Sequence, residues 1–142
     1  MRLELTRKTD LALRALRTLV ASETLRKGGE LAEALGTSAG FLAQVMSPLT
    51  RAGWVRSVPG PRGGYRATGA AVAVSVLQLV EAVEGPVRAD RCVLREQSCP
   101  TEVPCALHDA WMPARDALVE RLAATPVTAA TGKQGAGRSR KG

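Results

Sequence analysis

The stretch that decides the fold is residues 28–66, which reads GGELAEALGTSAGFLAQVMSPLTRAGWVRSVPGPRGGYR. Apolar residues at helical spacing predict a short helix over residues 30–35. Gly36 then ends this helix, because glycine accepts the left-handed backbone that often follows a last turn. The threonine and serine after Gly36 can each cap a second helix, which runs up to Gly53. Two helices joined by so tight a turn predict a helix-turn-helix.

A β-hairpin is predicted directly after these two helices. Residues 54–58 have the composition of a strand, residues 59–64 that of a glycine- and proline-rich turn, and residues 65–67 form the return strand. A glycine-rich loop that cradles a nucleotide phosphate would open a helix instead of a second strand. The hairpin therefore predicts a wing with a basic tip.

Further helices are predicted on both sides of this stretch. Apolar spacing predicts a helix over residues 9–22, with Thr9 or Asp10 as its cap. A capping-box pattern starts another helix over residues 75–84. We therefore expect residues 1–85 to form one winged helix-turn-helix domain.

The C-terminal part predicts a long helix over residues 105–124. Pro104 suits its first position, because an amide proton would be unpaired there anyway. A single apolar stripe follows, formed by Leu107, Trp111, Ala114, Leu118 and Leu122. Because the preceding domain is already complete, the stripe predicts a dimerisation helix, which Pro113 should kink at a cost of about 3 kcal/mol. The expected fold is mainly α with a small β-hairpin wing.

Composition and charge narrow the function. The chain has 142 residues, of which 45% are apolar, and carries a net charge of +7. We expect a cytoplasmic protein with no membrane segment and no small-molecule substrate. The net charge is +6 over residues 1–66, −3 over residues 67–124 and +4 over residues 125–142. The first segment predicts a polyanionic partner, and the last is expected to be a disordered basic tail.

All three cysteines and the only histidine lie close together in the sequence. Cys92, Cys99, Cys105 and His108 fall in and beside the segment 86–104, which we expect to bind a metal centre. Thiolates and imidazole are ligands that soft metals prefer, and an odd number of cysteines disfavours a structural disulfide framework.

The spacing of these ligands leaves several chemistries open. Loops of six and five residues suit an iron-sulfur cluster better than the short knuckles of zinc sites, but zinc, unligated thiols and a switchable disulfide remain alternatives. A Cys105 nucleophile with His108 as base lacks a third group to orient it. We therefore expect no enzymatic activity.

Several motifs carry a resemblance to a known family. They are TDLALR at 9–14, RAG at 51–53, GPRGGYR at 60–66, VEAVEG at 80–85 and the C-x2-H-x2-W pattern that begins at Cys105. In this order they resemble the Rrf-two family of winged-helix transcriptional regulators, over residues 1 to about 130. The family includes IscR-like and NsrR-like members that carry iron-sulfur clusters.

The resemblance implies two sets of cluster ligands. In IscR-like members three cysteines and a histidine hold a 2Fe-2S cluster, which here implies Cys92, Cys99, Cys105 and His108. In NsrR-like members an aspartate of the partner subunit completes a 4Fe-4S cluster, and Asp10 stands at that position. The 2Fe-2S assignment is favoured. The first cysteine gap is one residue longer than is usual in these relatives.

The resemblance also implies how the chain meets double-stranded DNA. Of the three base-contacting positions in IscR-like helices only Gln44 is kept, since Gly40 and Ala43 replace the other two, so a different operator is expected. Arg62 is expected in the minor groove. Phosphate contacts, or merely solvated charges in the case of the basic residues, are expected at Arg7, Lys8, Thr37, Ser38, Arg51 and Arg56. Together these features predict a homodimeric repressor that binds a palindromic promoter operator and is switched by a cluster sensing nitric oxide, iron, cluster supply or redox state.

Overall fold

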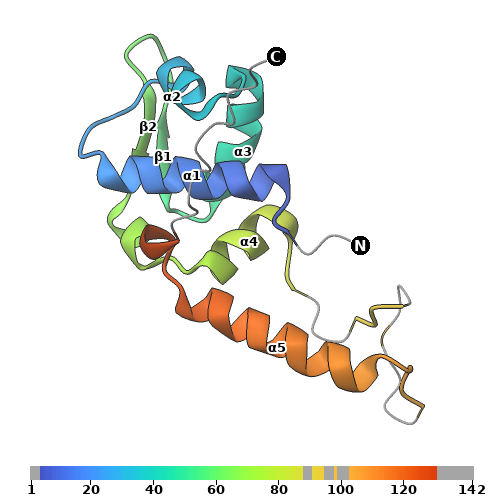
Figure 1. Ribbon diagram of the computed structural model, residues 1–142. Helices are drawn as coiled ribbons and strands as arrows, with labels where there is room; N and C mark the ends of the chain where they lie inside the picture. Colours follow the sequence, from blue (N-terminus) through green and yellow to red (C-terminus); the bar gives the residue numbers. More distant parts are fainter. Residues whose placement is uncertain (1–3, 88–90, 95–97, 99–102, 131–142) are drawn as a thin grey trace, which may run out of the picture.

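The computed structural model describes residues 4–87, 91–94, 98 and 103–130, and Figure 1 shows a mostly helical molecule with a single hairpin at one edge. The elements in chain order are α1 (Arg7–Ala21), α2 (Gly28–Leu35), α3 (Ala39–Arg51), β1 (Val55–Val58), β2 (Gly64–Ala67), the 3-10 helix η1 (Gly69–Ala73), α4 (Val76–Glu84), α5 (His108–Ala124) and the 3-10 helix η2 (Val127–Ala129). The fold class is therefore the predicted one.

The core lies around α1, which crosses the middle of the molecule. Figure 1 shows α2, α3 and the hairpin on one side of α1, with α4 and α5 on the other. One face of α1 is buried because its apolar residues recur every three or four positions. These residues are Leu11, Ala12, Ala15, Leu16 and Leu19.

The start of α1 corrects one sequence prediction. Thr6 caps the helix, and its hydroxyl oxygen accepts a hydrogen bond from the Thr9 amide over 3.2 Å. Thr9 and Asp10, the predicted caps, lie inside the first turn instead. Thr9 is fully buried, and its hydroxyl donates to the Glu84 carboxylate at the end of α4. The Thr9 hydroxyl is thus bonded to a residue distant in the chain and does not cap the helix.

The helix-turn-helix prediction is confirmed, although α2 begins at Gly28, two residues before the predicted start. Gly36 ends α2 in the left-handed conformation, with φ of 67°. Ser38 then caps α3, since its hydroxyl oxygen accepts a hydrogen bond from the Phe41 amide over 3.1 Å. The turn is short because the two caps stand only one residue apart, and α2 and α3 pack against the same core.

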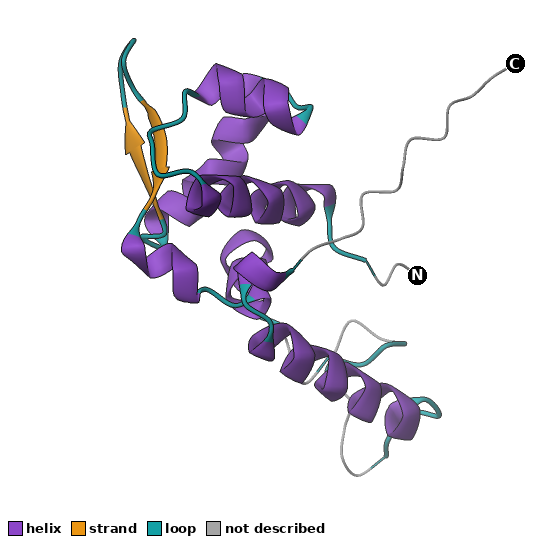
Figure 2. Cartoon of the chain, turned by 60° about the vertical axis from the view of Figure 1, so that its left-hand side comes forward, coloured by secondary structure: helices purple, strands orange, loops and turns teal. Residues whose placement is uncertain are grey.

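The hairpin is antiparallel, as predicted, and its register pairs Val55 with Ala67 and Val58 with Gly64. Its glycines serve close backbone packing. A Cβ atom on Gly63 would lie 1.9 Å from the carbonyl oxygen of Val58, and one on Gly64 would lie 2.2 Å from that of Arg26. The linker before α2 is thereby joined to the wing, and Figure 2 shows it running beside the two strands.

The predicted capping box at the start of α4 is present between Ser75 and Gln78. The start of α5 differs from the prediction, because the helix begins at His108 and not at residue 105. The His108 amide donates to the Cys105 carbonyl only three residues back, which makes a tight turn before the regular helix. Cys105 therefore lies outside the helix, while α5 continues through Pro113.

The predicted tail also starts too early. Residues after α5 return to the winged domain, where the Val76 amide donates to the Thr125 carbonyl and the Val127 amide donates to the Val74 carbonyl, each over 2.8 Å. Val127 is fully buried in the core. Thr125–Ala130 thus form a strap across the domain, and the remainder of the predicted tail, 131–142, lies outside the described residues. Of the described helices, none has the length and apolarity needed to cross a membrane.

Candidate functional site

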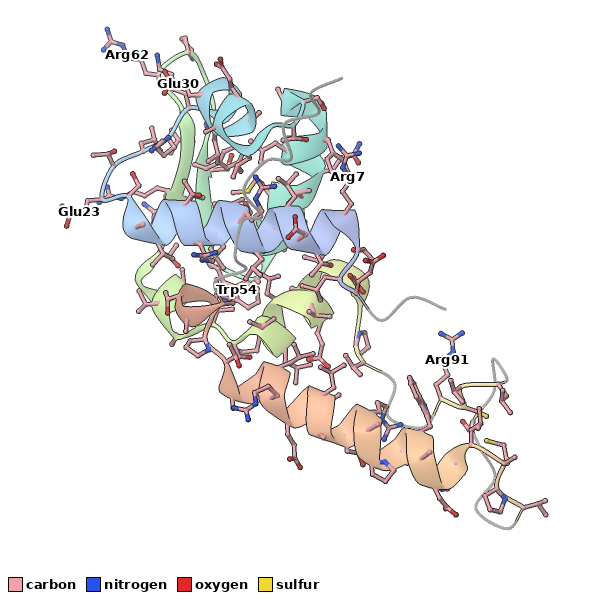
Figure 3. The ribbon with its side chains drawn as sticks, in the orientation of Figure 1. Arg7, Glu23, Glu30, Trp54, Arg62 and Arg91 are labelled. Carbon is pink, nitrogen blue, oxygen red and sulfur yellow. The ribbon has the colours of Figure 1, made fainter. Side chains whose placement is uncertain are left out.

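The amino end of α3 gathers several predicted DNA-binding residues. Arg7, Gly36, Thr37, Ser38 and Phe41 line a hollow of about 470 Å³. The guanidinium carbon of Arg7 lies 5.6 Å from the centroid of the Phe41 ring, and Figure 3 shows Arg7 at the start of α1 beside α3. Helix amino ends present unpaired backbone amides, so this hollow combines two features that suit a phosphate.

The outer face of α3 can approach a groove closely. Gly40, Ala43, Gln44 and Ser47 recur at helical spacing, and all four are exposed. Because three of them are small, Gln44 is the long side chain of this face. A glutamine amide can make two hydrogen bonds to adenine in the major groove.

The remaining predicted basic residues lie along α1, α3 and the wing. Lys8 is half-buried in the first turn of α1, while Arg51 ends α3 and is exposed. Arg56 lies on β1 with its side chain exposed, and Arg62 is at the exposed tip of the hairpin (Figure 3). Figures 1 and 2 both place the wing and the amino end of α5 at opposite ends of the molecule.

One exposed basic residue of the wing was not among the predicted DNA-binding residues. Arg66 stands directly opposite Arg56 in the hairpin register, and both side chains are exposed. The strand alternation of residues 65–67 is the signal that could have found it, but only the register shows which residue it faces.

The structure brings two of the predicted cluster ligands together. The sulfur atoms of Cys92 and Cys105 lie 3.5 Å apart, and Cys92 is 7% exposed. The indole nitrogen of Trp111 donates to the Arg91 carbonyl over 3.4 Å, so the segment around Cys92 lies against α5. Cys99 lies outside the described residues.

His108 is the first residue of α5, and its Nδ1 atom is buried without a hydrogen-bond partner among the described residues. A buried imidazole nitrogen with no partner is an unfavourable arrangement that metal ligation would relieve. His108 does not join the two sulfurs in this structure: the described residues contain no group of three His, Cys, Asp or Glu side chains close enough to hold one metal ion.

Asp10 lies elsewhere, on an exposed part of α1. Its carboxylate is 3.8 Å from the Arg14 guanidinium, one helical turn away. Within the described part of one chain Asp10 does not gather with the cysteines, so a role as ligand would require a second copy.

The donor chemistry at Cys92 and Cys105 fits a metal centre. A disulfide has an S–S bond of about 2.05 Å. Two thiolates on one tetrahedral metal, each about 2.3 Å from it, stand about 3.8 Å apart. The Cys92 thiol donates to the Cys105 sulfur over 3.5 Å, so the two residues are in contact but not joined by a disulfide. They supply two neighbouring sulfur donors of the kind that an iron-sulfur cluster or zinc uses.

The predicted dimerisation helix leaves its stripe largely uncovered. No residue of α5 is buried. Leu107, just before the helix, is 43% exposed, and Leu118 is 54% exposed. Large apolar side chains left open in this way on one helix are available for contact with another protein surface.

Fold and site together define a winged helix-turn-helix DNA-binding protein with a cysteine segment next to its last long helix. The chain belongs to the Rrf2 (Rrf-two) family, which its motifs resemble. The family's sequence profile, described as "Iron-dependent Transcriptional regulator", matches residues 5–130. The protein is thus a transcriptional regulator that binds DNA.

Individual relatives agree with this assignment. Protein aau3 of Rhizobium meliloti is 34% identical over 122 residues, which cover 84% of this chain and 79% of aau3. The HTH-type transcriptional regulator IscR of Vibrio vulnificus is 35% identical over 82 residues, 58% of this chain and 48% of IscR, so this match spans about half of IscR. The structure of CymR, the global cysteine regulator of B. subtilis, has a TM-score of 0.71 and 25% identity, and the match covers 92% of this chain and 100% of CymR.

Proposed function

We propose that the protein is a homodimeric transcriptional repressor whose affinity for a palindromic promoter operator is switched by an iron-sulfur cluster. The observation that carries this proposal is the pair of Cys92 and Cys105 sulfurs, 3.5 Å apart, and the same segment contains the buried Nδ1 of His108, which has no hydrogen-bond partner among the described residues. Cys92, Cys99, Cys105 and His108 would hold a 2Fe-2S cluster. Asp10 of the partner subunit is the alternative fourth ligand, for a 4Fe-4S cluster. Such a cluster supplies iron and sulfide that react with nitric oxide or oxidants, or that are lost when iron is scarce.

We propose that α3 and the wing are the two parts of the winged domain that contact DNA. The outer face of α3 enters a major groove, where Gln44 meets adenine. Thr37 and Ser38 hold a phosphate at the amino end of α3, and Arg62 inserts into the minor groove. The other phosphate contacts come from Arg7, Lys8, Arg51 and Arg56. A homodimer repeats these contacts on a second half-site, which explains a palindromic operator.

The dimer would form through the uncovered stripe of α5. Leu118→Glu places a charge on this stripe and should convert the dimer into a monomer in light scattering. Val72→Glu is the matched control, because Val72 is 58% exposed on η1 at a distance from the stripe. A Leu118→Glu variant that stays dimeric at low concentration would refute this interface.

The end of α4 would couple the cysteine segment to the DNA-binding side. The Glu84 carboxylate accepts hydrogen bonds from the hydroxyls of Thr6 and Thr9, which tie the end of α4 to the start of α1. The chain leaves α4 immediately afterwards and reaches Cys92. A change in the order of that segment can therefore displace the turn of α1 that carries Arg7. A tenfold change in DNA affinity needs only about 1.4 kcal/mol between the two states.

Anaerobic purification tests the cofactor. We expect a coloured protein with iron and sulfide, and a Mössbauer spectrum that His108→Ala alters but Asp109→Ala, its exposed neighbour on α5, does not. Asp10→Ala distinguishes the alternative ligand. A colourless protein with stoichiometric zinc and no iron would refute the cluster, and an unchanged spectrum of His108→Ala would remove the histidine.

DNA binding is tested separately, across a salt series, with protein that holds or lacks the metal centre. If several basic side chains contact DNA phosphates, the logarithm of the binding constant should fall linearly with the logarithm of the salt concentration. Equal affinity of the two forms would refute the switch while leaving DNA binding intact.

A second candidate function is favoured by the same sulfur pair. Cys92 and Cys105 are close enough that small movements would allow a disulfide, and CymR is named a regulator of cysteine. Exchange with a disulfide oxidant would join the two sulfurs and leave two reduced thiols on the oxidant. In this alternative, or with zinc at the same residues, DNA affinity would depend on the oxidation state of the cysteines and not on the iron content. Thiol titration and mass spectrometry would measure that oxidation state.

A further inference from the structure

We infer that Arg56 and Arg66 form a two-arginine clamp that holds one backbone phosphate of bound DNA on the outer face of the wing. The inference rests on the DNA-binding part of the proposed function. The hairpin register pairs Arg56 directly with Arg66, and both side chains are exposed. Side chains alternate between the two faces of a strand, so Val55 and Tyr65 pack toward the core while the two arginines point away from it.

The Arg56 and Arg66 side chains leave directly opposed backbone positions, and among the described residues neither is paired with a carboxylate. Directly opposed residues of an antiparallel pair have Cβ atoms about 4.5–5.5 Å apart. The ion pairs in the described part of the chain join Arg14 to Asp10 and Arg115 to Asp116, so neither wing arginine is neutralised there. Like charges in this position destabilise a hairpin, and an anion bound between them removes the repulsion.

A DNA phosphate is the anion that this position favours. The pair lies between Arg51 at the end of α3 and Arg62 at the wing tip, the residues proposed to meet the same duplex. Planar guanidinium forks bind phosphate oxygens in pairs, and two forks can share one phosphate.

The backbone beneath the clamp is rigid. The Arg26 amide donates a hydrogen bond to the Tyr65 carbonyl over 2.9 Å, and the Tyr65 amide donates one to the Arg26 carbonyl over 2.8 Å. These bonds join the linker before α2 to β2, next to Arg66. The backbone that carries Arg66 is therefore fixed before DNA binds, so binding has to order only the two side chains.

The test compares Arg56→Thr, Arg66→Thr and the double variant on a duplex that the wild-type protein selects from a random pool, over a series of potassium chloride concentrations. Arg121→Ala, an exposed arginine of α5, is the control. We expect weaker binding by each single variant, and a salt slope that is smaller by about 1.8 in the double variant, which corresponds to one phosphate on each of the two half-sites that a homodimer contacts. The melting temperature should stay unchanged or rise by up to about 4 °C, because a repulsive pair is removed.

Each other outcome overturns the clamp. A slope smaller by about 3.6 in the double variant means two separate phosphates on each half-site. An unchanged slope and affinity mean that this face does not contact DNA. A fall in melting temperature that accompanies the loss of affinity means a structural role. A wild-type protein that selects no duplex contradicts the proposed function itself, and this result is read before any variant is made.

Discussion

Replacing Val127 with alanine tests whether the strap after α5 is part of the winged domain. Val127 is fully buried among core residues, including Val74, although the sequence places it in a region with the composition of a tail. The substitution removes two methyl groups, which is about 1.6 kcal/mol at about 0.8 kcal/mol for each buried carbon. A cavity that collapses incompletely adds to this, so we expect a total loss of about 2–3 kcal/mol.

Urea unfolding of the full chain measures this loss. Val72→Ala is the matched control, because Val72 on η1 is 58% exposed, and its loss should stay within about 0.5 kcal/mol. Equal midpoints for the two variants would refute the burial of Val127. Two truncations sharpen the result: removal of residues 131–142 should leave the stability unchanged, whereas removal of residues 125–142 should lower it at least as much as Val127→Ala.

Three further predictions concern the DNA-binding half. Ser38→Ala should lower the free energy of unfolding by about 1 kcal/mol through loss of the α3 cap, while the exposed Ser57→Ala should not, and equal urea midpoints would contradict this. Gly63→Ala should weaken DNA binding several-fold by displacing the wing, and Gly69→Ala, where a Cβ meets nothing within 4 Å, should not. Burial raises the pKa of Glu84, but hydrogen bonds from two threonine hydroxyls outweigh it, so the pKa lies below its ordinary value of 4.5. Its stabilisation is therefore present above pH 4.5 and lost as the pH falls through the lower folded value, and unfolding curves of Glu84→Gln should lack this acid-side loss.

The elements with strong local signals were predictable. Gly36 and Ser38 mark a helix end and a helix start by their own conformational preferences, so the helix-turn-helix followed from the sequence. Local signals were insufficient where several residues could play the same part. Thr6, Thr9 and Asp10 can all cap α1 by residue type, and in the structure Thr6 is the cap while the Thr9 hydroxyl bonds Glu84, 75 residues away.

The candidate site was likewise predictable only in part. Cys92, Cys105 and His108 were identified by residue type and spacing, yet the helix expected to carry both Cys105 and His108 begins only at His108. A turn rather than a helix therefore brings Cys105 to within 3.5 Å of Cys92. The fourth ligand stays a prediction, since Asp10 could act only from a second copy.

The sequence by itself determined the class of fold, the basic character of residues 1–66 and the chemical identity of the proposed metal donors, because periodicity, charge and residue type are properties of the chain. Only the tertiary structure decided that Arg66 faces Arg56 and that Val127 belongs to the core. The physical reason is that register and burial depend on contacts between residues distant in the sequence. No local preference of arginine or valine encodes the partner that folding places opposite it.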